Sequence, residues 1–447
     1  MKRIFEILVI TVFWAIIYLA CHFIIRHYEA MTVWGNLAFG VIFSLYIFSL
    51  FYSRKWFRNF SARRYGSMAL LAASVAVAAF AAYTHHILQW SYNFYELYSD
   101  ASPGFIGKLR RTDPVFGYQH ISNARGRHVR MPGDTIAVYT DADGFRVAAA
   151  DTSHVNRHDN VDVIFFGCSF TYGELCPAES TFTDLASRGL GLRYLNAGVS
   201  GWGFSQMYLK AKELIPKYHP RYVVFQYSNW LPARSTGLYR YSIGYPVPKP
   251  YFDVPSSGGC TIQKPTFASQ MFDFDRDSMA HAFTGHPLAF LMRSGVPTTI
   301  MAEDMKRLKT WTREKMGNVH PIREDDKRLD LLAEQAYKEL MSFSSEQGAK
   351  PYILYLSSQQ KEIFGNYPEF LSSIDTSSVI DGMKYHKMHI KSDPGASVKW
   401  DFIHWRTDHG DTVKLDGHPN SYSHRLMARA VVERMRPEVD MHRNNVH

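Results

Sequence analysis

Cysteine is scarce in this chain, with four residues among 447, and no two of them have the spacing of a zinc site. The sequence also lacks low-complexity tracts, an internal repeat and any nucleic-acid-binding motif. These absences exclude a cysteine-based zinc module and a repeat architecture. They also leave the formal net charge of +9 without a nucleic-acid site to explain it. We therefore expect no nucleic-acid partner.

What the sequence does contain is 46% hydrophobic residues and three long apolar segments, at about 4–25, 33–52 and 67–88. Each has about the 20 residues that a helix needs to cross a bilayer. Buried core helices and a signal peptide are the alternatives. The first run is too long for a signal peptide, and no small-residue cleavage site follows it. The sequence predicts a membrane anchor of three transmembrane helices over residues 1–90, with the lipid bilayer as a partner.

Basic residues around these segments predict their orientation. Lys2 and Arg3 precede the first segment, whereas the loop after it has Arg26 offset by Glu29. The next loop carries five basic side chains: Arg54, Lys55, Arg58, Arg63 and Arg64. By the positive-inside rule the N-terminus is cytoplasmic, so three crossings place the rest of the chain in the periplasm or at the cell surface.

This orientation puts three of the cysteines in an oxidising compartment. Cys21 lies within the first apolar segment, and Cys168, Cys176 and Cys260 follow the last one. Three cysteines permit one disulfide and one leftover thiol. We expect a Cys176–Cys260 pair, although the sequence does not fix the connectivity.

The soluble part begins with a linker and a small β-containing lead-in over 91–160, and its main domain spans 161–447. Apolar runs that alternate with amphipathic stretches indicate this division. The predicted strands are 161–167, 193–199, 221–228 and 351–358, and the predicted helices are 205–218, 325–348 and 420–435. Ser205 is the expected N-cap of the first helix. Continuous apolar strands between helices predict an α/β fold with a three-layer, mostly parallel sheet, whose ligands bind beyond the carboxyl ends of the strands.

One segment, at about 231–323, interrupts the alternation and is rich in Tyr, Pro and Gly. It has two interpretations. It is either a surface insertion, or a lid or substrate-recognition wall over a site.

Candidate catalytic residues and glycines follow the predicted strands. The four stretches are "FFGCSFTYG", "NAGVSGWG", "YSNW" and "LDGHPN". They contain Ser169; Gly198, Gly201 and Gly203; Asn229; and Asp416 with His418. Acyl transfer by serine needs a nucleophile, a base, a group that orients the base, and donors for the oxyanion. All four kinds of residue are present at predicted strand ends.

These four stretches, over about 161–436, resemble the blocks of SGNH (GDSL-type) serine hydrolases, which occur in the same order. The resemblance implies an α/β/α fold with Ser169 as nucleophile, His418 as general base and Asp416 as the group that orients it. The backbone amides of Ser169 and Gly201 and the side-chain amide of Asn229 would form the oxyanion hole. The family chemistry requires neither a cofactor nor a metal.

The sequence departs from the family pattern in three places. Cys168 replaces the aspartate that usually precedes the serine, and we expect it to affect packing or tuning. The third block usually reads Gly-x-Asn-Asp, but here Asn229 lies between Ser228 and Trp230. The last block has Asp-x-His instead of a three-residue spacing, which leaves the role of Asp416 less fixed than that of His418. This variant resembles membrane-associated members that act on cell-envelope polysaccharides.

Other interpretations of these residues remain open. Ser169 could cap a helix, or Cys168 could be the nucleophile, although a free thiol outside the cytoplasm is prone to oxidation. Gly198 is a rival of Gly201 as donor, and Asn229 could cap the following segment. His418 could simply begin the last helix, and its competitors as base are His404, His409 and His424. His424 falls inside that helix and is expected to be structural. The stretch 404–411 has a metal-like composition, but His and Asp are common in solvated loops.

The sequence therefore predicts a membrane-anchored serine esterase or O-acyltransferase that acts on O-acetyl esters of cell-envelope polysaccharide. An acylated glycan or a small ester is the expected substrate, and the anchor would allow a membrane partner protein. Lipid and thioester substrates stay open. The alternative is a catalytically inactive SGNH-like module that binds glycan or scaffolds an envelope assembly. Three apolar segments are too few for a transporter or channel.

Overall fold

The computed structural model describes residues 105–444, apart from 108, 114, 132–133, 149–160, 237–238, 241–246, 254–260, 264–321, 358–362, 365–368, 394, 397–400 and 409–410. The chain divides into two compact units, Met1–Asn93 and Phe94–His447. The predicted spans 4–25, 33–52 and 67–88 lie outside the described residues. Within the described part of the chain, no helix combines the length and the apolar character needed to cross a membrane.

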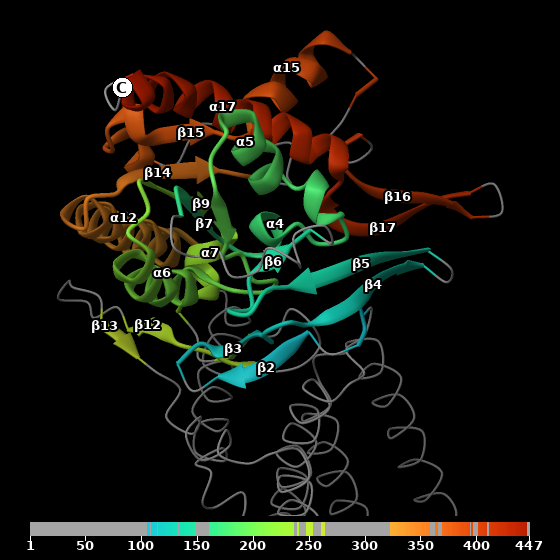
Figure 1. Cartoon of the computed structure of the whole chain (residues 1–447), viewed down its shortest axis with the longest axis horizontal. Helices are drawn as coiled ribbons and strands as arrows, with labels where there is room; N and C mark the ends of the chain where they lie inside the picture. Colours follow the sequence, from blue (N-terminus) through green and yellow to red (C-terminus); the bar gives the residue numbers. More distant parts are fainter. Residues whose placement is uncertain are drawn as a thin grey trace, which may run out of the picture. The chain divides into compact units, whose positions relative to one another are not determined.

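A five-stranded sheet forms the centre of the described fold (Figure 1). Its strands are β7 (Val163–Phe166), β8 (Tyr194–Asn196), β9 (Tyr222–Tyr227), β14 (Lys350–Tyr355) and β15 (Val379–Asp381). Their order is β15-β14-β9-β7-β8, and every neighbouring pair is parallel. All residues of β7 and β9 are buried, as expected for strands covered on both faces. The predicted α/β fold with a parallel sheet is confirmed.

Helices cover both faces of this sheet (Figure 1). One face carries α5 (Phe182–Leu190) and α17 (Ser421–Asn444), and the other carries α6 (Phe204–Tyr218), α7 (Trp230–Arg234) and α12 (Ile322–Glu346). Shorter helices are α4 (Ser169–Tyr172), η5 (Ala178–Ser180), α14 (Glu369–Ser372), η6 (Thr376–Ser378) and α15 (Lys384–Ser392). The predicted N-cap of α6 is wrong: Gly203 precedes the helix, where its amide donates to Gln206 Oε1, and the Ser205 hydroxyl donates to the Pro250 carbonyl.

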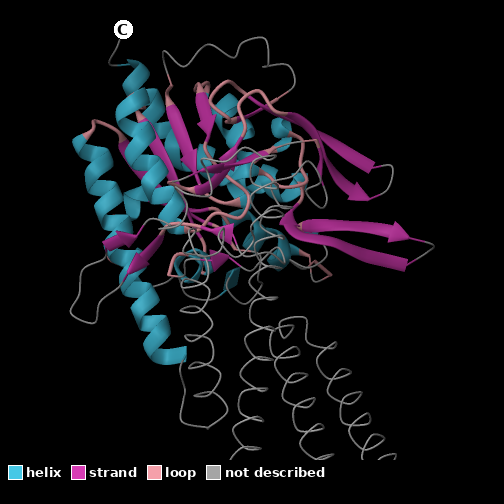
Figure 2. Ribbon diagram, turned by 90° about the horizontal axis from the view of Figure 1, so that it is seen from below, coloured by secondary structure: helices cyan, strands magenta, loops and turns pink. Residues whose placement is uncertain are grey.

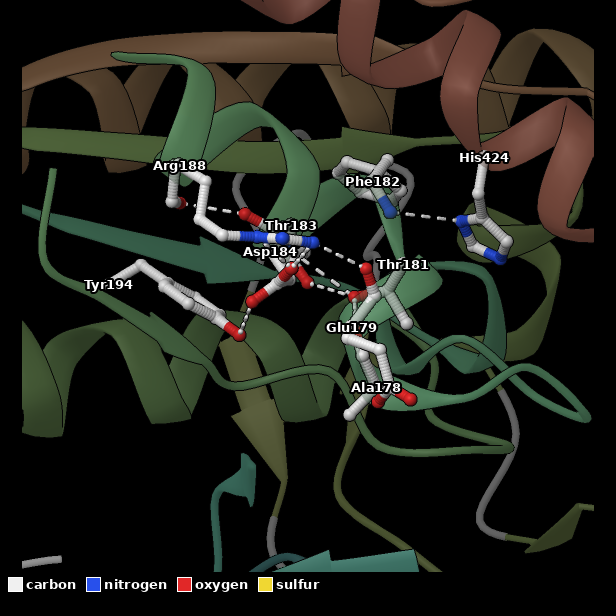
Figure 3. A network of polar contacts seen from close by, with 10 residues as sticks. Ala178, Glu179, Thr181, Phe182, Thr183, Asp184, Arg188, Tyr194 and His424 are labelled. Atoms are coloured by element: carbon white, nitrogen blue, oxygen red, sulfur yellow. Dashed lines mark hydrogen bonds and ion pairs between the residues drawn. The ribbon is translucent and has the colours of Figure 1, made fainter. Parts of the chain in front are cut away.

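The last helix is fixed to α5 by a polar network (Figure 3). The backbone amide of Phe182 donates to Nδ1 of His424, 3.2 Å away, and the two rings stack. Thr181 caps α5 by accepting from the Asp184 amide, and the Asp184 carboxylate accepts from Tyr194 on β8. Burial lowers the pKa of His424 to about 3, so this imidazole is neutral at physiological pH. The predicted structural role of His424 is confirmed.

Two smaller β units precede the main sheet. β1 (Phe105–Ile106), β4 (Arg125–Met131), β5 (Asp134–Thr140) and β6 (Arg146–Val147) form an antiparallel sheet in the order β1-β4-β5-β6. β2 (Arg110–Asp113) pairs with β3 (Gly117–His120). We call residues 105–148 the lead-in. Two more short pairs lie within 231–323: β10 (Tyr239–Arg240) with β11 (Val247–Pro248), and β12 (Tyr251–Asp253) with β13 (Thr261–Gln263).

A long hairpin precedes the last helix. It consists of β16 (Ile403–Asp408) and β17 (Asp411–Pro419), which pair antiparallel. This hairpin and β4–β5 extend from the same side of the fold (Figures 1 and 2). The interpretation of 404–411 as a solvated loop is wrong for 404, because His404 lies in β16 with 7% of its surface exposed.

Candidate active site

The first block forms a tight turn between strand and helix. β7 ends at Phe166, Cys168 occupies the N-cap position of α4, and Ser169 is the first residue of that helix. A Cβ at Gly167 would come 2.0 Å from Thr171 Oγ1 and 2.5 Å from Gln226 Oε1, so a larger residue does not fit. The Cys168 side chain makes no capping hydrogen bond. The turn therefore delivers Ser169 to the carboxyl edge of the sheet.

Gln226, at the end of β9, holds this turn in place. Its Oε1 accepts from the Cys168 amide at 3.1 Å and from Thr171 Oγ1 at 2.8 Å, and its Nε2 donates to Ser228 Oγ at 2.9 Å. β7 and β9 are neighbours where the sheet order reverses direction, since β8 lies on one side of β7 and β9 on the other. In such sheets ligands bind at this point.

Cys168 is a buried thiol beside the nucleophile candidate. Its Sγ lies 3.9 Å from Ser169 Oγ and contacts the Gln226 amide. Burial by itself raises the pKa of this thiol, but Arg234 and hydrogen bonds from Phe170 and Gln226 outweigh it and lower the pKa. The residue that replaces the family aspartate is thus packed into the Gln226 contact.

Three of the blocks meet at the residue after Ser169. The Phe170 ring makes edge contacts with the Trp230 ring, at 5.1 Å between centroids, and with the His418 ring, at 5.8 Å. α4 also contacts β17. Ser169 is buried with 4% of its surface exposed, whereas His418 is half-buried and Asn229 is exposed. The structure brings the predicted serine, asparagine and histidine blocks to one place.

The second block packs directly behind the nucleophile helix. A Cβ at Gly198 would come 2.4 Å from the Tyr172 amide nitrogen, so only glycine allows this approach. The Gly198 amide already donates to Asn196 Oδ1 at 3.0 Å, which disfavours it as the oxyanion donor. Gly201 has φ +93°, a conformation that favours glycine, and it is the remaining predicted donor of this block.

Asn229 stands at the N-cap position of α7, yet its side chain makes no capping hydrogen bond. The capping alternative is therefore wrong for this side chain. The short helix that follows begins with Trp230, whose ring contacts Phe170. Trp230, which replaces the aspartate of the resembled pattern, thus packs against α4.

The last block lies on β17, which includes both Asp416 and His418. The backbone of Asp416 pairs with that of His404, but its side chain lies outside the described residues. His404 Nε2 lies 3.7 Å from the Sγ of Cys176.

Cys176 is a free thiol in the structure, so the predicted Cys176–Cys260 disulfide is wrong. Its Sγ donates to the Pro419 carbonyl at 3.4 Å, and the Ser421 hydroxyl donates to it at 3.7 Å. Burial raises the pKa of this thiol to about 11. The Cys176 thiol therefore packs against Pro419 and Ser421 at the end of the last block, and not against a second cysteine.

Sequence reasoning missed the contribution of the lead-in to this site. Arg146 is 2% exposed, and it donates to the backbone carbonyls of Tyr172, Gly173 and Cys176. Its guanidinium also lies over the Tyr172 ring, 4.4 Å from the centroid. His128 Nε2 is 2.9 Å from the Tyr172 hydroxyl. Residues of β4 and β6 therefore hold the end of α4 and the segment that follows it. The sequence carried little signal of this role, because β6 has only two residues, Arg146 and Val147.

No family model matches the chain, and no curated protein matches it. Among solved structures, it is similar to one described as a lipolytic protein of the G-D-S-L family from Desulfitobacterium hafniense DCB-2. The sequences are 9% identical, the match covers 62% of this chain and 99% of that one, and the TM-score is 0.26. At this TM-score the overlap does not by itself establish a shared fold, and the candidate site rests on the residues described above.

Proposed function

We propose that the chain is a serine esterase or O-acyltransferase of the SGNH type, with Ser169, His418 and Asp416 as its catalytic residues. The observation that carries this proposal is the meeting of the serine, asparagine and histidine blocks around Phe170 at the switch point of a parallel sheet. The three blocks thus lie at the carboxyl edge of the sheet, where ligands of such sheets bind.

The chemistry follows the acyl-enzyme route. Ser169 Oγ attacks the carbonyl carbon of an ester while His418 takes its proton, and the carbonyl oxygen becomes an oxyanion. The amides of Ser169 and Gly201 and the Asn229 side chain donate to that oxyanion. Collapse of the intermediate breaks the ester bond, and His418 returns the proton to the leaving alcohol. Water or a second hydroxyl then attacks the acyl-serine, which gives hydrolysis or transfer.

We further propose a substrate and a location. O-acetyl groups on a cell-envelope polysaccharide fit the predicted topology, in which residues 1–90 anchor the chain in the membrane and the catalytic part lies in the periplasm or at the cell surface. A reporter enzyme fused near residue 100 is expected to lie outside the cytoplasm, so a reporter that works only there should be active and one that works only in the cytoplasm should be inactive. Activity of the cytoplasm-dependent reporter at this position would contradict the topology.

The full chain, purified in detergent, tests the catalytic proposal with a fluorophosphonate probe and intact-mass measurement. One adduct is expected on the wild type, none on Ser169→Ala, and labelling at least about 10³-fold slower on His418→Ala. Ser187→Ala is the matched control, because this serine is buried in α5 and its hydroxyl bonds to the Thr183 carbonyl. Labelling of that variant should equal that of the wild type.

No adduct on a folded wild type would contradict the esterase proposal and favour the glycan-binding module. Where an adduct forms, acetate release from O-acetylated polysaccharide identifies the substrate class. Thioester and phospholipid substrates serve as competitors in the same assay. Faster turnover of either would replace the polysaccharide assignment.

A further inference from the structure

Glu174 lies in an unusual turn directly after α4. Gly173 before it has φ +80°, and Leu175 after it has φ +59°, in the left-handed region that leucine rarely adopts. A Cβ at Gly173 would come 2.3 Å from Thr181 Cγ2. Two such conformations on either side of one residue fix the direction of its side chain. Strain of this kind persists where the surrounding structure requires it, often at functional sites.

The Glu174 carboxylate points into the candidate site. Its Oε1 lies 3.7 Å from Nδ1 of His128, and it has a hydrogen bond with Ser200, the residue before Gly201. It also interacts electrostatically with His418. Its Oε2 is buried and has no hydrogen-bond partner among the described residues. The carboxylate is therefore linked to the second block by a hydrogen bond and to the last block by electrostatic interaction, and one of its oxygens has no hydrogen-bond partner among the described residues.

Charged and titratable groups face Glu174 from several elements. They are Arg110 of β2, His120 of β3, His128 of β4 and His418 of β17. Burial alone would raise the pKa of Glu174, but its charged neighbours outweigh burial and lower it to about 2. Burial lowers the pKa of His120 to about 3 and that of His128 to about 4. Near pH 7 the carboxylate is thus ionised while both lead-in histidines are neutral.

We propose that Glu174 is a positioning residue for acyl transfer, a second carboxylate that acts through His418 and does not touch the substrate. This inference rests on the proposed function. When Ser169 attacks, its proton moves to His418 and the imidazole becomes a cation. An ionised Glu174 stabilises that cation in addition to Asp416. Both Asp416 of the shortened Asp-x-His block and Glu174 would then stabilise the protonated form of His418.

The pKa of His418 in the full chain tests this inference. Diethyl pyrocarbonate modifies the neutral imidazole, so the pH dependence of modification of the His418 peptide, read by mass spectrometry, gives that pKa without enzyme activity. Glu174→Gln removes the charge and keeps the size, and the pKa of His418 is expected to fall by about one unit or more. Glu179→Gln, which alters an exposed carboxylate on the same segment, should leave it unchanged. An unchanged pKa in Glu174→Gln overturns the inference.

A second variant decides the matter if Glu174→Gln does not fold. Asp416→Asn leaves the strained turn intact and removes the other carboxylate. With Glu174 acting on it, His418 keeps a pKa at or above its ordinary value of about 6.5. A pKa of His418 below that value in Asp416→Asn overturns the inference.

Kinetics separate this inference from the proposed function. If the chain hydrolyses p-nitrophenyl acetate, Glu174→Gln should lower the plateau of kcat/KM about tenfold and move its ascending limb to lower pH, because His418 then loses its proton more easily. A lower plateau with an unmoved limb would indicate a merely structural role and contradict the inference. If the wild type has no activity, the proposed function fails, and the His418 titration still decides the role of Glu174.

Discussion

The five-stranded sheet and the lead-in support the candidate site in opposite ways. The sheet does so with apolar packing, since Val163, Ile164, Val223 and Ile353 have none of their surface exposed. The lead-in does so with buried polar groups, among them His120, His128 and Arg146, which contact Tyr172 at the end of α4. Both belong to the same compact unit.

This difference teaches how the two regions divide their roles. Apolar burial is proportional to area and has no direction, so it stabilises the sheet without specifying the orientation of a loop. The hydrogen bonds of Arg146 and His128 have direction, and their partners lie within four residues of one another, from Tyr172 to Cys176. The sheet would therefore determine where Ser169 lies, and the lead-in would determine how the segment behind it is held.

The largest expected effect is that of Arg146→Met. The change leaves three buried carbonyl oxygens without their donor, and it should lower the free energy of unfolding by about 3–5 kcal/mol. Fluorophosphonate labelling of the folded fraction should also slow at least tenfold, because the segment after α4 loses its support. Denaturant unfolding and labelling rates of the full chain measure both. A wild-type labelling rate in a destabilised Arg146→Met variant would contradict the proposed role of the lead-in in holding the segment after α4.

The matched change in the sheet is Ile353→Ala. This β14 side chain is fully buried, and its truncation should lower the free energy of unfolding by about 2–5 kcal/mol. The labelling rate of folded protein should equal that of the wild type, because β9 lies between β14 and β7, the strand that leads into α4. The same two measurements apply. Slowed labelling in this variant would show that the sheet also controls the loop behind the nucleophile.

Acid should weaken the lead-in through His120. The pKa of His120 is lowered by burial to about 3 in the folded chain, against about 6.5 when unfolded. The unfolded state therefore binds its proton first, and stability that is present above pH 6.5 is lost as the pH falls toward 3. The loss is about 1.4 kcal/mol per pH unit for this residue.

His120→Gln should remove that part of the pH dependence. Denaturant unfolding between pH 7 and pH 4.5 compares its slope with that of the wild type. His442→Gln, which changes an exposed histidine of α17, is the control and should keep the wild-type slope. Equal slopes in all three chains would contradict the burial of a neutral His120.

The smallest expected effect is that of Tyr172→Phe. It removes the hydroxyl that bonds to His128 and should lower the free energy of unfolding by about 1 kcal/mol. Tyr352→Phe is its counterpart in the sheet, because it removes a single hydrogen bond to Glu438. Only Tyr172→Phe should alter the labelling rate, by about two- to fivefold. Equal labelling rates of Tyr172→Phe and Tyr352→Phe would contradict the proposed division of roles between the lead-in and the sheet.

The regular part of the fold could be predicted because its signal is local. The apolar run at 221–228 predicted a strand, and β9 occupies Tyr222–Tyr227. The same reasoning found α12 and α17, whose apolar spacing repeats along the helix. It failed at Ser205, because the cap of α6 depends on the Gln206 side chain and on a contact with Pro250.

The candidate site could be predicted only where a motif carried it. The motifs pointed to Ser169, Asn229 and His418, and the structure brings their blocks together. No motif pointed to Glu174 or Arg146, because their contacts join segments about 30 to 250 residues apart and depend on tertiary packing. The β16–β17 hairpin was missed for a related reason: its pairing with itself, and not an apolar alternation, defines its strands.

The pairing of β9 with β14 makes part of the sequence between them exchangeable. The two strands are neighbours in parallel register, from Lys350 opposite Tyr222 to Tyr355 opposite Tyr227, and each has a second partner in the sheet. Doubling the length of a flexible connection costs only about 0.6 kcal/mol. A foreign segment grafted over residues 264–321, between β13 and α12, would therefore leave the strands in register and would keep Phe252, whose ring packs against Phe204 in the core. Protein engineers could vary that stretch as a cassette.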